Sequence, residues 1–126
     1  HILGTNLWNV PGIGRRAGIF ANNLLFVDSF FSGDTRPSVR SLIGGFRSTF
    51  GEDPTVLELQ AIDTALLVQS VLRSGANSRS RFASVLLENP GFQGSISHLT
   101  LNETREFVRP LISLGVSSDQ IVPKTK

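Results

Sequence analysis

The sequence predicts an α/β fold in which helices flank a parallel sheet and a small antiparallel sheet is added at the C-terminal end. The first observation is the apolar run Leu24–Val27, which is typical of a strand covered by helices on both faces. The second is a set of three helical patterns between residues 37 and 89. The third is the alternation of polar and apolar residues from Gly94 to Leu101, which is typical of a half-exposed strand. This order of elements indicates one layered α/β domain.

The N-terminal part is predicted to contain two strands with a helix between them. Ile2–Thr5 is expected to form a short buried strand that ends in the polar loop Asn6–Asn9. The segment 11–22 is expected to be a helix, weakened by its three glycines. The strand at 23–31 carries the strongest signal, and Ser32-Gly33-Asp34 ends it.

Start and stop signals bound all three central helices. Pro37 begins the first, whose apolar residues recur at helical spacing until Gly51 ends it. Ser78 is a suitable cap for the last helix, and Asn89-Pro90-Gly91 stops it.

The helix between Pro54 and Gly75 is too apolar for an ordinary surface helix. Its apolar residues do not fit one narrow stripe: Val56, Leu57, Leu59, Ala61, Ile62, Ala65, Leu66, Leu67, Val68, Val71 and Leu72. A helix that is apolar on two sides packs between two partners, and the helix at 37–50 supplies one of them. Only two parallel-type strands are predicted, so the helices carry more apolar surface than these strands can cover.

The C-terminal third is predicted to be a small sheet. Asn102–Arg105 is turn-like, and a strand is expected over 108–115. A further strand at 120–122 is expected to pair with it as a hairpin across 115–119.

Composition excludes several classes of protein. The formal net charge of the 126 residues is +2, and the arginines are scattered, whereas nucleic-acid binding needs a concentrated basic stripe. Cysteine is absent, which removes disulfides and cysteine-based zinc sites. No apolar run reaches the ~20 residues that cross a bilayer, and no signal peptide is predicted. Because the first residue is His1, we expect a processed or excised piece, or a residue added ahead of Ile2 by cloning.

Several motifs favour a structural role over chemistry. Gly12–Ala17 matches the G-x-G-x-x-A form of a dinucleotide fingerprint, but Asn9-Val10-Pro11 separates it from the preceding strand, so a loose helix with exposed arginines is preferred. His98 has no second histidine nearby, so a solvent-facing residue is preferred to a metal ligand. No serine lies in G-x-S-x-G, and no triad is recognisable, so the sequence predicts neither an enzyme nor a cofactor.

Asp63 places a carboxylate on the most apolar helix. An unpaired buried carboxylate is costly, so Asp63 needs a partner. We expect a structural hydrogen bond to a loop.

Candidate ligand contacts follow the two predicted parallel strands, because ligands of open α/β sheets lie beyond the carboxyl ends of the strands. Asn6, Trp8 and Asn9 follow the first strand, and an indole with two amides can stack on and hydrogen-bond a small solute. The alternative is that Trp8 covers a hydrophobic edge of the core. Phe30 ends the second strand and is the fourth candidate, although packing is the preferred role for Phe30. Asp28 is expected to pair with an arginine or to cap a helix.

Taken in order, six stretches resemble the C-terminal part of type 1 periplasmic binding proteins. This family includes the branched-chain amino-acid-binding proteins of ABC transporters, and lipoproteins that activate penicillin-binding proteins share its fold. The stretches are LGTNLWN, ANNLLFVDSFF, FRSTFGEDP, LQAIDTALLVQSVLRSG, SRSRFASVLLEN and GFQGSISHLTLNETREFVRPLISLGVSSDQIV. The chain departs from the family at Ile62, where an aromatic residue is usual, and at Asn102–Arg105, which lacks the usual glycine.

The resemblance implies that residues 1–126 are a single C-terminal fragment of a two-lobed protein. Residues 1–31 would be part of the second lobe and a crossover, 32–92 the helical part of the first lobe, and 93–126 a crossover and the terminal strands. The fragment would pair with its missing N-terminal half, or self-associate as a homodimer, to cover its apolar surface.

The resemblance also implies an extracytoplasmic, periplasmic solute-binding protein that holds a small polar solute between its lobes and delivers it to a membrane permease. Asn6, Trp8, Asn9 and Phe30 would contact this small-molecule ligand. No acidic residue lies in the loop Asn6–Asn9 to hold an ammonium group, which favours an uncharged ligand or the alternative role. That alternative is a regulatory lipoprotein that activates a cell-wall synthase in peptidoglycan synthesis. In either role, a lipid anchor on the absent N-terminus would be the contact with the membrane, and no nucleic acid or metal is implied.

Overall fold

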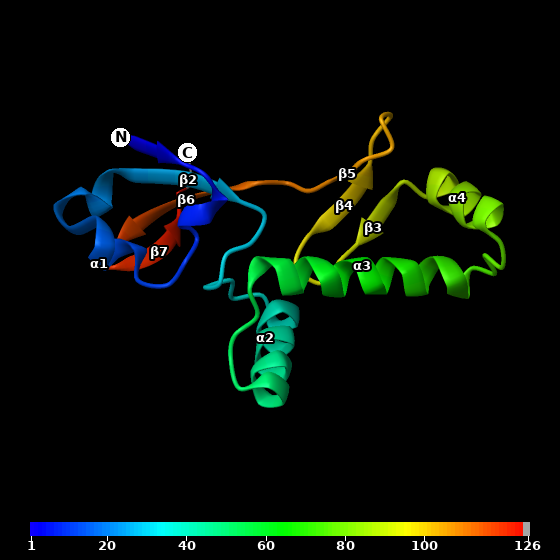
Figure 1. The fold of residues 1–126 in the computed structure, drawn as a ribbon, viewed down its shortest axis with the longest axis horizontal. Coiled ribbons are helices and arrows are strands. Elements are labelled where there is room, and N and C mark those ends of the chain that lie inside the picture. The colour runs from blue at the N-terminus through cyan, green and yellow to red at the C-terminus, as the bar shows by residue number, and fades with distance from the viewer. Residues whose placement is uncertain (125–126) are drawn as a thin grey trace. The chain divides into compact units, whose positions relative to one another are not determined.

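Residues 1–124 are described by a computed structural model, in which the chain divides into two units (Figure 1). Unit 1 comprises His1–Thr35 together with the chain from Leu111 onward, and unit 2 comprises Arg36–Pro110. The chain therefore passes between the units twice. The first passage lies at Thr35–Arg36 and the second at Pro110–Leu111.

Unit 1 is built on a four-stranded sheet in the order β1-β2-β6-β7. Its elements are β1 (Ile2–Gly4), η1 (Asn6–Trp8), α1 (Ile13–Ala17), η2 (Gly18–Asn23), β2 (Leu24–Asp28), β6 (Ile112–Ser117) and β7 (Gln120–Pro123), where η marks a 3₁₀ helix. β1 pairs parallel with β2, and the other two pairs are antiparallel. The predicted α/β class, with a parallel pair and an antiparallel addition, is confirmed.

The core of unit 1 lies on one face of this sheet. Its buried residues are Ala21, Leu24, Phe26, Leu114 and Val116. Phe26 faces Leu114 across the pair of β2 and β6, so this register brings two of the most buried side chains together.

The two N-terminal strands are present, but their predicted burial is wrong. Along β2, Leu24, Phe26 and Asp28 are buried while Val27 is 41% exposed, so one face of the strand is covered instead of both. β1 is an outer strand of the sheet, and Leu3 is 74% exposed. The helix predicted over 11–22 is divided into α1 and η2, because the backbone at Gly18 leaves the helical region with a φ of 55°.

Unit 2 combines three helices with a three-stranded antiparallel sheet in the order β3-β4-β5. Its elements are α2 (Pro37–Phe50), α3 (Val56–Arg73), α4 (Arg79–Glu88), β3 (Gly91–Gln93), β4 (His98–Leu101) and β5 (Phe107–Val108). The three helices are those predicted.

Local caps explain why these helices begin and end where they do. The Ser78 hydroxyl accepts the backbone N–H of Arg81 at the start of α4. At the start of α3, Thr55 and Glu58 form a capping box, in which the backbone N–H of Thr55 donates to the Glu58 carboxylate at 2.6 Å. Gly51 follows α2 as its C-terminal cap.

The strand predictions of the C-terminal third need correction. β4 begins at His98 instead of Gly94, and β3 was not predicted. The strand predicted over 108–115 is two strands in different units, β5 and β6, because Pro110 lacks the N–H that a continuous ladder needs. The predicted hairpin is confirmed: β6 and β7 are joined by the two-residue turn Ser118-Asp119, whose φ angles are both positive, 48° and 64°.

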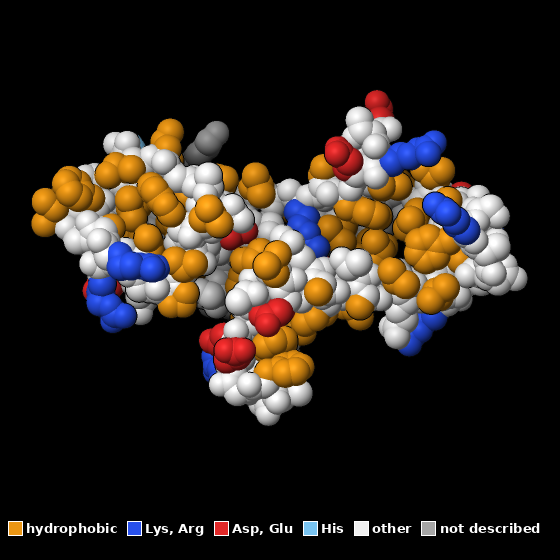
Figure 2. All heavy atoms as spheres, viewed as in Figure 1, with side chains coloured by type: hydrophobic (Ala, Val, Ile, Leu, Met, Phe, Trp, Pro, Cys, Tyr) orange, Lys and Arg blue, Asp and Glu red, His pale blue; other side chains and the backbone are white. Residues whose placement is uncertain are grey.

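Apolar side chains of α3 remain exposed, as the sequence indicates. Leu59 and Val71 are buried, whereas Leu57 is 77% exposed and Leu72 is 55% exposed. One open hollow on α3 has a volume of about 620 Å³ and is lined by Ala65, Val68, Gln69, Leu72 and Arg73. Another, of about 530 Å³, lies along α2 and is also lined by Ile62 of α3 and by Ser95. Hydrophobic side chains reach the surface on both units in Figure 2.

None of the helices formed by residues 1–124 is long and apolar enough to span a membrane.

Candidate functional site

The predicted ligand contacts lie in unit 1, at the carboxyl ends of two neighbouring parallel strands. η1 follows β1 directly, and the backbone N–H of Asn9 closes its turn on the Asn6 carbonyl at 2.9 Å. Phe30 lies two residues beyond the end of β2. Because β1 and β2 are parallel neighbours, these segments lie close together at the end of the sheet where both strands have their carboxyl ends.

Asn9 joins the two segments. Its Nδ2 donates to Asp28 Oδ2 and to the Phe30 carbonyl, both at 2.9 Å. Both partners are acceptors, which fixes the orientation of the amide and uses both of its N–H groups. The Asn9 side chain can therefore form a further hydrogen bond only as an acceptor, through Oδ1.

Asp28 is buried at 4% exposure, and its carboxylate accepts hydrogen bonds that hold the end of β2 in place. Its Oδ1 accepts the backbone N–H of Ser29 at 2.6 Å and the Ser29 hydroxyl at 3.3 Å. Its partners are thus Ser29 and Asn9, in place of the predicted arginine or helix terminus.

Trp8 combines a packed ring with an accessible donor. The ring is partly buried against the core and meets Phe26 edge-on, with 6.3 Å between centroids. It also lies against Gly4, where a Cβ would overlap it. The indole Nε1 makes no hydrogen bond within residues 1–124, and no buried side-chain nitrogen in that range lacks a partner, so this N–H reaches the surface.

The other two candidates differ in exposure. The Asn6 side chain is exposed and makes no hydrogen bond to the described residues. The Phe30 side chain is 5% exposed, and its carbonyl is occupied by Asn9. Phe30 therefore has the burial of a packing residue, and the ligand-contact role of Asn6, Trp8, Asn9 and Phe30 stays a prediction.

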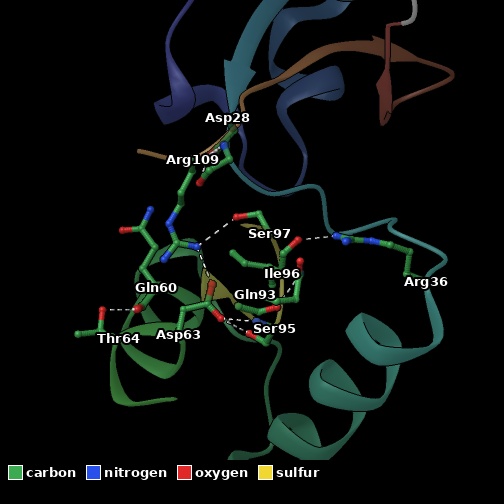
Figure 3. A network of polar contacts seen from close by, with 12 residues as sticks. Asp28, Arg36, Gln60, Asp63, Thr64, Gln93, Ser95, Ile96, Ser97 and Arg109 are labelled. Atoms are coloured by element: carbon green, nitrogen blue, oxygen red, sulfur yellow. Dashed lines mark hydrogen bonds and ion pairs between the residues drawn. The ribbon is translucent and has the colours of Figure 1, made fainter. Parts of the chain in front are cut away.

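A second polar cluster lies in unit 2 and is centred on Asp63 of α3, whose side chain is fully buried (Figure 3). Asp63 Oδ1 accepts the backbone N–H of Ser95 at 2.6 Å and its hydroxyl at 2.5 Å. Asp63 Oδ2 accepts Arg109 Nη1 at 2.6 Å, and the same nitrogen lies 3.4 Å from Ser97 Oγ. The predicted hydrogen bond from Asp63 to a loop is confirmed. Arg109 was not predicted, since nothing local in the sequence connects it with Asp63.

The loop beside Asp63 fits because residue 94 has no side chain. A Cβ on Gly94 would lie 2.5 Å from Asp63 Oδ2 and 2.8 Å from the Ser97 carbonyl. Glycine is therefore required for the close approach of backbone and carboxylate.

The arginines of the glycine-containing motif and His98 are exposed, as the sequence predicts. Gly12 precedes α1, and Arg15 and Arg16 of that helix are exposed. His98 is exposed on β4. Within residues 1–124, no group of three or more histidine, aspartate or glutamate side chains is placed to hold a metal ion.

Comparisons with known proteins identify the fold. No family model matches the sequence, and no curated protein matches it. Among solved structures, a branched-chain amino acid ABC transporter protein from Rhodospirillum rubrum superposes with a TM-score of 0.85 and 18% identity, over 97% of this chain and 36% of that one. A leucine-binding protein from Thermotoga maritima gives 0.71 and 16%, over 98% and 36%. A solute-binding protein of an ABC transporter from R. palustris, in complex with benzoate, gives 0.70 and 15%, over 96% and 34%.

The chain therefore has the fold of part of these substrate-binding proteins, which confirms the resemblance to type 1 periplasmic binding proteins at the level of the fold. It spans about a third of the length of each.

Proposed function

We propose that this chain is part of a two-lobed, extracytoplasmic solute-binding protein of the ABC-transporter type. The observation that carries the proposal is the superposition of nearly the whole chain on such a protein with a TM-score of 0.85. In this role, two lobes close on a small solute, and binding free energy offsets the cost of closure. The periplasm is the compartment that this role implies.

The lobe assignment follows from the same proposal. Residues 1–31 contribute to the second lobe and a crossover, 32–92 form the helical part of the first lobe, and 93–126 supply a crossover and the terminal strands. The exposed apolar side chains of α3, such as Leu57 and Leu72, support a further part of the protein, or a second copy, that covers them.

The edge of the sheet in unit 1 favours an uncharged, hydrogen-bonding solute. Neutral donors and acceptors are available here from the side-chain amide of Asn6, the indole N–H of Trp8 and the side-chain Oδ1 of Asn9. Residues 2–14 include no charged side chain, and the nearby Asp28 is buried and already accepts three hydrogen bonds. A ligand ammonium or carboxylate would find no opposite charge in this loop, whereas a sugar, polyol or amide finds suitable partners.

A thermal-shift measurement on the full-length protein that carries this chain tests the proposal. The probes are D-glucose, D-glucosamine and D-gluconate, which share a carbon skeleton and differ in charge, together with N-acetyl-leucinamide, leucine and benzoate. A solute bound only by the native state stabilises it, by about 2.7 kcal/mol at 100 times its Kd. We expect a neutral probe to raise the Tm most. Absence of a shift across the panel contradicts solute binding, whereas a shift with a charged probe alone contradicts only the ligand class.

The absence of charge in the loop Asn6–Asn9 also favours a second candidate, a periplasmic lipoprotein of this fold that regulates a cell-wall synthase. Co-purification of the full-length protein with a peptidoglycan synthase, together with a negative solute panel, would support that role.

A further inference from the structure

Both passages of the chain between the units form hydrogen bonds with the same three-residue segment of unit 2. Ser95, Ile96 and Ser97 lie between β3 and β4, and we call them the 95–97 anchor. Arg36, at the first passage, donates from Nη2 to the Ile96 carbonyl at 2.5 Å. Arg109, at the second passage, reaches Ser97 Oγ and Asp63 (Figure 3).

The 95–97 anchor is itself firmly held. Ile96 is 2% exposed and Ser97 is 9% exposed. The backbone N–H of Gly94 donates to the Ser97 carbonyl at 3.0 Å, and Ser95 binds Asp63 through both its N–H and its hydroxyl. Hydrogen bonds to a charged group are stronger than neutral ones, and buried networks of this kind act as a unit.

We propose that this anchor couples the two passages, so that Arg36 and Arg109 are positioning residues for both of them. When one passage is displaced, its hydrogen bond to the 95–97 anchor displaces the anchor as well. Because the anchor is also bonded to the other passage, that passage is disturbed in turn. The two passages are then protected or exposed to exchange together. The use of this coupling in closing on a solute rests on the proposed function, but the coupling itself does not.

A purely local role makes a different prediction. If each arginine only holds its own stretch of backbone, removing one of them leaves the other passage unaffected. Local opening of a structure is visible in amide hydrogen exchange, which therefore separates the two cases.

The experiment measures hydrogen exchange of the full-length protein without solute, in Arg36→Gln, Arg109→Gln and the matched control Arg79→Gln, an exposed arginine of α4 that lies outside both passages. In Arg36→Gln we expect exchange over 105–113 to rise about three- to ten-fold, as the loss of the hydrogen bond to the Ile96 carbonyl implies. In Arg109→Gln we expect the same over 33–40. The control leaves both segments unchanged, and exchange in β2 and β6 stays constant in all three variants.

Two further variants keep the test decisive if Arg109→Gln does not fold. Ser97→Ala removes the contact of Arg109 with the anchor and keeps its ion pair with Asp63, and we expect faster exchange over 33–40. Arg109→Lys keeps one charged donor and is expected to restore part of the protection. Faster exchange confined to the passage next to each substitution would overturn the coupling. Because no solute is present, this result is independent of whether the protein binds one.

Discussion

Asp63 and Arg109, which are 46 positions apart in the sequence, form an ion pair with 2.6 Å between Oδ2 and Nη1. The Asp63 side chain is fully buried and that of Arg109 is 13% exposed. The pair joins α3 to the residue that follows β5. Removal of one member of a buried pair leaves the other charge unpaired, so substitution of either residue is expected to destabilise unit 2 strongly.

Asp63→Ala is expected to destabilise the full-length protein by about 3–5 kcal/mol, because Arg109 and both Ser95 donors lose their acceptor. Urea denaturation followed by circular dichroism measures this change. Glu103→Gln, at an exposed position in a turn, is the control and should stay within about 0.5 kcal/mol of the wild type. A loss below about 1 kcal/mol for Asp63→Ala would show that the cluster contributes little net stability.

Gly94→Ala is expected to cost about 2 kcal/mol or more, because the added methyl group overlaps the Asp63 carboxylate and the Ser97 carbonyl. Gly44→Ala is a matched control within α2, since nothing lies within 4 Å of its added Cβ. That substitution should stabilise the helix by about 0.5–1 kcal/mol, as alanine is the better helix former. The same denaturation measurement compares the two, and equal effects of like sign would refute the predicted close approach.

Asn9→Ala is expected to destabilise the protein by about 1–3 kcal/mol, because Oδ2 of the buried Asp28 and the Phe30 carbonyl lose the Asn9 donor. Asn22→Ala, at an exposed position of η2, is the matched control and should be nearly neutral. Thermal unfolding of both variants gives the comparison. An unchanged Tm for Asn9→Ala would mean that the link between the two strand ends is not formed in solution.

The Arg47 guanidinium, which donates to Asp53 at 2.6 and 2.8 Å, lowers the pKa of the Asp53 carboxyl below its ordinary value. A lowered pKa in the folded state means that the pair stabilises the fold above the unfolded-state pKa of Asp53, and that this contribution is lost as the pH falls through the folded-state value. Both side chains are well exposed, so the effect on stability is small.

An NMR titration of the Asp53 carboxyl tests this relationship. In Arg47→Gln the pKa should return toward its ordinary value, whereas Arg40→Gln, in the same helix, should leave it lowered. Equal pKa values in the wild type and in Arg47→Gln would contradict the contact.

The exposed apolar side chains of α3 predict that the isolated segment 1–126 self-associates. Leu57 is 77% exposed and Leu72 is 55% exposed, and burial of a leucine side chain yields about 1.5–3 kcal/mol. Sedimentation analysis should show dimers or larger species, and the double variant Leu57→Lys/Leu72→Lys should shift them toward the monomer. Ile19→Lys, at an 88% exposed position in unit 1, is the control and should change nothing. A monodisperse wild-type monomer would contradict the prediction.

The helices of unit 2 could be predicted from the sequence because their signals are local. The Ser78 hydroxyl acts within three residues, and the Thr55–Glu58 capping box spans a single turn. The strands could not be placed as well, because pairing partners lie far apart along the chain. The apolar run Leu24–Val27 does not reveal that only one of its faces is covered.

The positions of the candidate residues in the fold could be predicted to a similar extent, whereas their contact with a ligand stays a prediction. The rule that ligands lie beyond the carboxyl ends of strands located Asn6, Trp8 and Asn9 at the sheet edge. It gave no information about the link from Asn9 to Asp28, which depends on the parallel pairing of β1 and β2. The partner of Asp63 could not be predicted, since Arg109 reaches it only after α3 and the strands of unit 2 have come together.

The outer position of β1 determines how the sheet of unit 1 can be extended. One hydrogen-bonding edge of this strand pairs with β2. The peptide groups along its other edge pair with no strand among residues 1–124. Such an edge accepts an incoming strand through main-chain hydrogen bonds, which depend little on side-chain identity. Mutational drift at Ile2 or Leu3 would therefore leave this capacity for strand addition intact, unless proline were introduced.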